Sequence, residues 1–183
     1  PALCFEDYTG ESAKLETCVS LIASASAAGH KILLFSQFAS MLERIQERLL
    51  QEGISSHLLV GATPKEERSR MVQAFASDEV PVFLISLKAG GTGLNLTAAD
   101  IVIHYDPWWN VAAQNQATDR AYRIGQEKPV TVYKLILKDT IEENLLKLQN
   151  AKLALAAQVV SEGMVSLGDL SQNELMELFE QNP

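Results

Sequence analysis

The sequence predicts an α/β fold of three layers, in which helices cover both faces of a central, mostly parallel sheet. Short apolar, β-branched runs recur along the chain, and segments with a helical spacing of apolar residues separate them. Gly and Pro residues stand at many of the boundaries. Strands that alternate with helices pair in parallel, and such a sheet is buried on both faces.

Each predicted element has its own signal. Leu15, Val19 and Ile22 have the spacing of one helix face, and Gly29 and Gly53 are natural stops for the first two helices. The predicted helices cover residues 11–28, 39–52, 63–75, 140–161 and 171–179. The third and fourth begin with the capping boxes Thr63-Pro64-Lys65-Glu66 and Thr140-Ile141-Glu142-Glu143. The predicted strands cover residues 31–35, 57–60, 82–86, 101–105 and 131–137.

Composition excludes several classes of protein. A chain of 183 residues can bury one full core, and 47% hydrophobic with 21% charged residues is typical of a globular rather than a disordered domain. No apolar run approaches the ~20 residues of a membrane helix. Cys4 and Cys18 form no C-x-x-C pair, so we expect reduced, structural thiols in a cytoplasmic protein. The chain begins with Pro and shows no signal peptide, so we expect a piece of a longer protein.

The net charge of −8 is unevenly distributed. Residues 1–29 carry one Lys against four acids, and residues 139–183 carry two Lys against eight acids. Residues 30–138 hold twelve Lys and Arg against eleven acids. Because local patches decide contact with phosphate, the acidic total neither supports nor excludes a nucleic-acid partner.

Two unusual segments follow predicted strands. Gly90, Gly91 and Gly93 form a turn after the strand that ends at Ser86, and such a turn lets backbone N–H groups approach a phosphate closely. The sequence Tyr105-Asp106-Pro107-Trp108-Trp109-Asn110 follows the next strand. Ligands of parallel sheets bind beyond the carboxyl ends of the strands, so both segments are expected on one rim.

Residues 116–126 read Gln-Ala-Thr-Asp-Arg-Ala-Tyr-Arg-Ile-Gly-Gln. Arg120 and Arg123 are three residues apart, so on a helix or helical turn their guanidinium groups leave from one face and can converge on one anion. A guanidinium keeps its charge and suits a transferring phosphoryl group, and Asp119 and Gln116 could orient the pair. The alternative for an isolated R-x-x-R is a solvated helix face.

In this order, the glycine turn, the Trp-Asn pair and the arginine segment resemble motifs five and six of the SWI/SNF-type ATPases, the double-stranded DNA translocases of helicase superfamily two. Residues 31–38 are similar to motif four, residues 57–64 with Arg68 and Phe75 resemble the stretch that follows, and the C-terminal end is similar to bacterial members. The resemblance implies an N-terminal helix in 1–29, the second RecA-like lobe of a two-lobed motor in 30–138, and a helical extension in 139–183 that braces the first lobe.

The resemblance also implies roles for single residues. Arg120 and Arg123 match arginine fingers, and Gln116 matches the polar residue that opens their motif. The remaining implied positions contact nucleotide or DNA: Gly91, Gly93 and Asn95 in the sensing loop, Trp109 on the DNA track, and Ser36, Ser86 and Lys88 at phosphates. Trp108 can equally be core or contact. Val111 and Gln114 stand where the family usually has a proline and an acid, which puts the DNA-contact geometry in question.

Parts of an ATPase are missing from the sequence. No G-x-x-x-x-G-K-[ST] occurs, and Asp78-Glu79 precedes a strand instead of ending one. His30, His57 and His104 are scattered, so no metal site is expected. The resemblance therefore implies that ATP and Mg²⁺ bind mainly to a first lobe of the parent protein, and that this chain holds no tightly bound cofactor and is inactive as an ATPase alone.

The implied partners are that first lobe and double-stranded DNA, without sequence preference because backbone contacts carry no sequence information. A DNA-bound protein or RNA polymerase is a further expectation, with a cytoplasmic, nucleoid-associated location and no membrane partner. A non-enzymatic RecA-like module that binds protein or nucleic acid is the alternative. A dinucleotide enzyme is disfavoured, since Gly91-x-Gly93 lacks the third glycine of that fingerprint.

Overall fold

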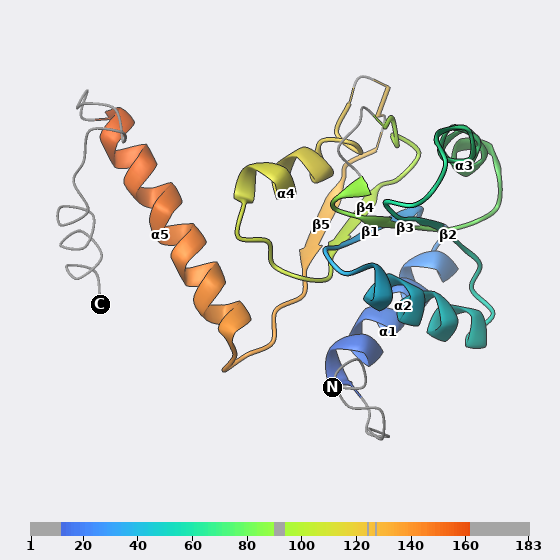
Figure 1. Cartoon of the computed structure of the whole chain (residues 1–183), viewed down its shortest axis with the longest axis horizontal. Coiled ribbons are helices and arrows are strands. Elements are labelled where there is room, and N and C mark those ends of the chain that lie inside the picture. The colour runs from blue at the N-terminus through green and yellow to red at the C-terminus, as the bar shows by residue number, and fades with distance from the viewer. Residues whose placement is uncertain (1–11, 90–93, 124, 127, 162–183) are drawn as a thin grey trace. The chain divides into compact units, whose positions relative to one another are not determined.

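The computed structural model describes residues 12–89, 94–123, 125–126 and 128–161. The chain divides into two compact units, Pro1–Leu137 and Lys138–Pro183. The first unit contains a sheet with helices on both faces, and the described part of the second contains one long helix (Figure 1).

The sheet of the first unit has five strands within the described residues, and every pair is parallel. The strands are β1 (Ile32–Ser36), β2 (Ser56–Leu59), β3 (Val82–Ser86), β4 (Ile101–His104) and β5 (Thr131–Lys134). Their order across the sheet is β2-β3-β1-β4-β5. The predicted parallel α/β fold is therefore confirmed, although β5 ends three residues earlier than predicted.

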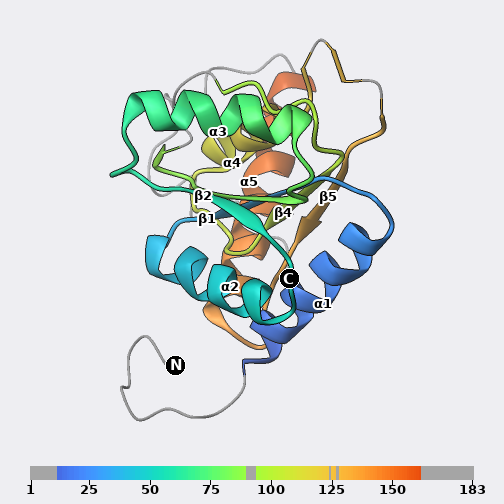
Figure 2. The ribbon, with the colours of Figure 1, turned by 90° about the vertical axis from the view of Figure 1, so that its right-hand side faces the viewer.

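Helices cover both faces of this sheet. They are α1 (Ala13–Ala27), α2 (Ala39–Gln51), α3 (Lys65–Ser77) and α4 (Val111–Thr118). Figure 2 shows α1 and α2 on one side of the strands and α3 and α4 on the other. The short helix α4 was not predicted as an element of its own.

The strand β1 lies at the centre of two apolar cores, because successive side chains of a strand point to opposite faces. Leu34 packs among Ile22 of α1 and Ile45 of α2. Phe35 packs on the other face, in the cluster that contains Phe75 of α3 and Ala117 of α4. All five residues of β1 are buried, which explains a continuous apolar run without alternation.

The helix ends show which capping signals were correct. Gly29 and Gly53 have φ values of 82° and 74°, and they follow α1 and α2 as predicted. The predicted capping box at Thr63 is wrong. Thr63 Oγ1 instead accepts from Val60 N at 3.1 Å, and Thr63 N donates to Val60 O at 3.1 Å. This reciprocal pair closes the turn after β2, and α3 begins at Lys65 without a side-chain cap.

The second unit contains α5 (Ile141–Ser161), whose range matches the prediction. Thr140 Oγ1 accepts from Glu142 N at 3.2 Å, and the Glu143 carboxylate accepts from Asp139 N at 2.8 Å. The start of α5 is therefore capped as expected, with the carboxylate contact moved by one residue. The predicted helix 171–179 lies outside the described residues. None of the described helices has the length and hydrophobicity needed to cross a membrane.

Candidate functional site

The carboxyl ends of β1, β3 and β4 form one rim, as the parallel sheet requires. Ser36 and Ser86 are paired in the register of β1 and β3. Just beyond the strand ends, Leu87 N donates to Ser36 O and Tyr105 N donates to Phe35 O, each at 2.9 Å. The chain that enters the glycine turn and the segment that begins at Tyr105 therefore leave the sheet on the two sides of the end of β1.

A buried Ser–Asp pair joins the end of β1 to the segment that follows β4. The Ser36 hydroxyl donates to the Asp106 carboxylate, which also accepts from Gln37 N at 3.3 Å. Both side chains are buried. A DNA contact by Ser36 stays a prediction, and in this structure its hydroxyl already has an acceptor. Asp106 was not assigned a role from the sequence, although an acid directly after an apolar strand is a recognisable signal.

The predicted residues around the glycine turn differ in exposure. Ser86 is buried, whereas Lys88 and Asn95 are exposed. Gly91 and Gly93 lie outside the described residues. Arg68 of α3 donates through Nη1 to Ala89 O at 3.0 Å, so α3 holds the start of the turn.

An open pocket of about 440 Å³ lies beside that contact. Its lining residues are Lys65, Arg68, Ser69, Val72, Gln73, Leu94 and Asn95. Two of its side chains are cationic and none is acidic, so this side of α3 is compatible with an anionic neighbour.

The Trp-Asn segment both exposes an aromatic ring and starts a helix. Trp109 is 70% exposed, and its ring centroid is 6.0 Å from that of the half-buried Trp108. Asn110 Oδ1 accepts from Ala113 N at 3.2 Å and caps α4. The amide of the buried Gln114 accepts weakly from Trp108 N at 3.5 Å. The capping role of Asn110 was missed from the sequence.

Both arginines lie beyond the end of α4. Helix α4 ends at Thr118, and Arg120 lies in the turn that follows, where Ala121 N donates to Thr118 O at 3.0 Å. Arg120 is 3% exposed, whereas Arg123 is exposed. Beyond the helix end, the carbonyl of Arg120 accepts from Leu96 N at 3.2 Å, so the turn is joined to the segment that follows the glycine turn. That the two guanidinium groups converge on one anion stays a prediction. Gln116 and Asp119 are exposed near the end of α4.

The guanidinium of Arg120 is incompletely satisfied. Its Nε and Nη1 atoms are buried and have no hydrogen-bond partner among the described residues. Burial lowers the pKa of Arg120, and the charge of Arg123 lowers it further, so the two guanidinium groups lie close enough to repel each other. A buried charge with unpaired donors costs free energy, and an anion placed between the two arginines would remove that cost.

Two side chains fix the turn that carries Arg120, and neither was predicted. His104 Nε2 lies 2.9 Å from Thr118 Oγ1, the last residue of α4, and Thr118 Oγ1 donates to Gln114 O at 3.3 Å. Gln126 Nε2 donates to Thr97 O at 3.0 Å, to Ala99 O at 2.7 Å and to Ala121 O at 3.3 Å. The arginine turn is thereby attached to β4 and to the segment that follows the glycine turn.

The other two histidines lie near the amino ends of strands, at the end of the sheet opposite the rim. His30 Nδ1 is 2.9 Å from Asp100 Oδ2, and His57 Nε2 is 2.7 Å from Asp78 Oδ2. Both pairs stand at the amino ends of strands, away from the rim. In the part of the chain that the structure describes, no group of three His, Cys, Asp or Glu side chains could hold a metal ion.

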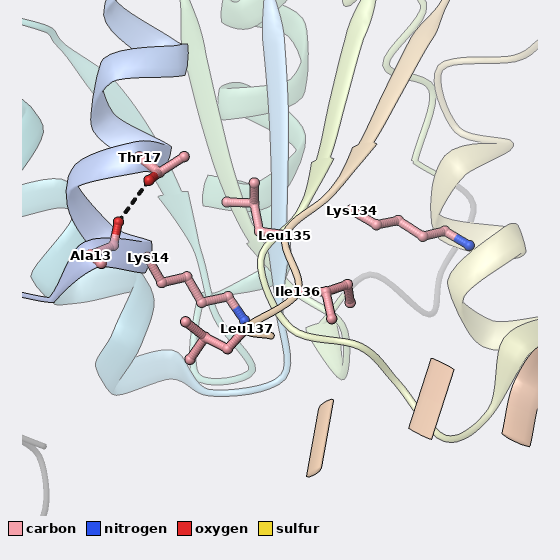
Figure 3. Close-up of a pocket in the computed structure, with 7 residues that line it drawn as sticks. All are labelled: Ala13, Lys14, Thr17, Lys134, Leu135, Ile136 and Leu137. Carbon is pink, nitrogen blue, oxygen red and sulfur yellow. Dashed lines mark hydrogen bonds between the residues drawn. The ribbon is translucent and has the colours of Figure 1, made fainter. Parts of the chain in front are cut away.

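A second pocket of about 270 Å³ lies between α1 and the chain that leaves β5. Figure 3 shows Lys14 reaching from α1 towards Leu137, while Lys134 points away. Lys14 Nζ is 5.0 Å from the centre of the Tyr105 ring, and Thr17 Oγ1 donates to Ala13 O at 2.7 Å. The polar groups from α1 are therefore engaged within the protein, and this pocket is separate from the arginines.

Comparison with known proteins places this geometry in a family. The helicase conserved C-terminal domain matches residues 13–125. A putative ATP-dependent helicase/translocase of Bacillus subtilis, YwqA, is 45% identical over 95% of this chain, and the chromatin-remodeling ATPase INO80 of Homo sapiens is 38% identical over 95%. The chain spans 19% and 11% of their lengths, respectively.

A solved structure also matches. The C-terminal part of the Fun30 ATPase domain superimposes with a TM-score of 0.72 at 34% identity, and the match covers 75% of this chain and 45% of that one. This likeness confirms the RecA-like fold, and the named relatives confirm the predicted resemblance to SWI/SNF-type ATPases. The chain therefore belongs to the helicase conserved C-terminal domain family.

Proposed function

We propose that this chain is the C-terminal motor lobe of an ATP-dependent double-stranded DNA translocase, and that Arg120 and Arg123 contact the phosphates of ATP bound to a first lobe of the same parent chain. The observation that carries the proposal is the buried guanidinium of Arg120, which has two donor atoms without partners among the described residues. Arg123 is close enough to influence its pKa and is exposed. A phosphate is the ligand that this pair suits best.

The two arginines would have different roles, because one side chain is buried and the other is exposed. Arg120 is held rigidly by burial and by the bond from Leu96 N to its carbonyl at 3.2 Å, so it would supply a fixed charge. Arg123 is exposed and can reach a nucleotide held by another lobe. Charge grows on the phosphoryl oxygens in the transition state, and an arginine finger is typically worth ~10³–10⁵ in rate. Gln116, Gly91, Gly93 and Asn95 are the further residues that we assign to the nucleotide side.

ATP and Mg²⁺ would bind mainly to the first lobe. The orphaned donors of Arg120 fit a phosphate. The sequence contains no G-x-x-x-x-G-K-[ST] loop, so this chain alone would be inactive. ATP bound on the first lobe supplies the phosphoryl group, and this chain supplies the charges that meet it.

The DNA track would use the same rim. Lys88 and Trp109 are exposed where the chain leaves β3 and β4, and they can meet phosphate and sugar directly. Ser36 and Ser86 are buried, so their contact with DNA would require the rim to open. The names of the relatives, an ATP-dependent helicase/translocase and a chromatin-remodeling ATPase, support an ATP-driven action. The proposed lack of sequence preference rests on contacts with the DNA backbone.

We further propose three parts of the chain. Residues 1–29 form a leading helix, residues 30–138 form the second RecA-like lobe, and residues 139–183 form an extension that braces the first lobe. We infer a cytoplasmic, nucleoid-associated protein whose substrate is DNA carrying a bound protein or RNA polymerase. These assignments rest on the family resemblance and extend beyond the 19% of the Bacillus relative that this chain matches.

The test is DNA-stimulated ATP turnover by the full-length parent with Arg120→Ala and Arg123→Ala. We expect turnover to fall by ~10³-fold or more for each variant while ATP binding is retained, because a finger acts on the transition state. Arg48→Ala is the matched control, since Arg48 of α2 pairs with Glu16 of α1 and with Glu52 at the end of α2, and its loss should leave turnover unchanged. Normal turnover in both finger variants would favour a non-enzymatic binding module.

A further inference from the structure

We propose that Gln126 is a positioning residue that couples the segment after the glycine turn to the two arginines, and thereby sets the rate of ATP turnover. The inference rests on the proposed function. The side chain of Gln126 bonds to backbone groups, and its effect would pass through the backbone that carries Arg120 and Arg123.

The amide of Gln126 joins two segments that are distant in sequence. Its Nε2 donates to Ala99 O at 2.7 Å and to Thr97 O at 3.0 Å, in the stretch that follows the glycine turn. The same nitrogen donates to Ala121 O at 3.3 Å, directly after Arg120. Two N–H groups thus serve three carbonyls, so the contact with Ala121 is the longest and the easiest to lose.

Backbone bonds carry this link to both arginines. Leu96 N donates to Arg120 O at 3.2 Å, and Gln126 N donates to Arg123 O at 3.0 Å. Gln126 Oε1 accepts from Lys128 N at 2.9 Å, which fixes the orientation of the amide. A shift of residues 94–99 would therefore displace the carbonyls of both arginines.

The chain conformation before Gln126 is specialised for this contact. Gly125 has a φ of 106°, in a region that residues with a side chain rarely adopt. The turn directs the chain back so that the Gln126 amide reaches the carbonyls of Thr97 and Ala99. The Gln126 amide donates to three carbonyls of buried or half-buried residues. We therefore interpret this turn as a connection between two segments of the chain.

Gln126→Glu is the sharpest perturbation. It keeps the size of the side chain but replaces the donor with a carboxylate oxygen, which would face three carbonyl oxygens and repel them. In the full-length parent we expect the kcat of DNA-stimulated ATP turnover to fall by ~10- to 100-fold, because small misplacements of a catalytic group have effects of that size. The KM for ATP should change by less than about two-fold, since ATP binds mainly elsewhere.

A double-mutant cycle separates positioning from general damage. If Gln126 acts through the arginines, Gln126→Glu should cost less than about two-fold in an Arg123→Ala background. Gln46→Glu is the matched control, because Gln46 Nε2 donates to Ser56 O at 3.3 Å on the other face of the sheet, and this variant should leave kcat unchanged. Gln126→Asn replaces Gln126→Glu in the cycle if the latter does not fold, as it keeps the amide but shortens its reach.

The outcomes are distinguishable. A fall in kcat that vanishes in the Arg123→Ala background supports the positioning role. If Arg123→Ala abolishes turnover but the Gln126 variant is normal, or its loss multiplies with that of Arg123→Ala, the positioning role is overturned and the proposed function stands. If Arg123→Ala itself leaves turnover intact, the proposed function fails and the positioning role fails with it.

Discussion

His104 illustrates how burial fixes the chemistry of one residue. The side chain is 1% exposed, its ring stacks 5.6 Å from that of Phe35, and burial followed by the charge of Lys134 lowers its pKa to about 4. The ring is therefore neutral near pH 7. Because Thr118 Oγ1 donates to Gln114 O, the hydroxyl can accept, and His104 Nε2 carries the proton.

This pKa predicts a pH dependence of stability. The unfolded chain takes up a proton near pH 6.5, whereas folded His104 does so only near pH 4, so the free energy of unfolding should decrease as pH falls from about 6.5 to about 4. The full effect corresponds to about 3 kcal/mol. Urea unfolding of the 183-residue chain at pH 7.5 and pH 5 measures it.

His104→Gln is the control for that measurement. The glutamine Nε2 can still donate to Thr118 but does not titrate, so the variant should lose less stability than the wild type between pH 7.5 and pH 5. An identical loss in both proteins would show that other groups cause the pH dependence.

At the scale of elements, Lys31 joins the end of α3 to the start of β1. Its ammonium donates to Phe75 O and, at 2.8 Å, to Asp78 O, and it lies 4.6 Å from the centre of the Phe75 ring. Asp78 in turn binds His57 of β2 at 2.7 Å. Burial alone would raise the pKa of Asp78, but His57 and Lys31 outweigh it and lower that pKa. Asp78 therefore contributes stability that is lost only as pH falls through its lowered pKa.

Lys31→Met should therefore destabilise the first unit. The change keeps an apolar stem but removes the donors from the last carbonyls of α3, at a cost of about 1–3 kcal/mol. Lys128→Met is the matched control, because Lys128 is largely exposed and pairs with Asp100 only at 3.6 Å, a contact worth well under about 1 kcal/mol. Equal unfolding free energies for the two variants, measured in urea at pH 7.5, would contradict the role of Lys31.

The elements also show what the sequence could predict. Four strands begin and end within one residue of prediction, because apolar β-branched runs are local signals. The bond from Leu96 N to Arg120 O, beyond the end of α4, was not predicted, because Leu96 is distant in sequence. The links made by Asp106, Gln126 and His104 were missed for the same reason, since the partners of each meet only after the sheet has formed.

For the whole molecule, the sequence predicts the shared rim but does not predict which of its side chains are buried. Parallel strands place their carboxyl ends together, so the motifs had to meet there. Whether a side chain is buried depends on the packing of α4 and of residues 94–99 over the sheet. Ser36, Ser86 and Arg120 are accordingly buried, while Lys88, Trp109 and Arg123 remain exposed. We therefore expect Lys88, Trp109 and Arg123 to contact a ligand before the buried residues do.

The proposed two-lobed motor requires that the isolated chain cannot hydrolyse ATP. The 183-residue sequence contains no G-x-x-x-x-G-K-[ST] loop. Burial, followed by the charge of Arg123, lowers the pKa of Arg120, so its charged form is disfavoured until an anion is bound. We expect no ATP turnover above the buffer rate, with or without double-stranded DNA, while the parent protein is active under the same conditions. A phosphate-release assay measures both. Turnover by the isolated chain that Arg123→Ala abolishes would mean that this chain holds a complete active site, and the division of labour between two lobes would have to be abandoned.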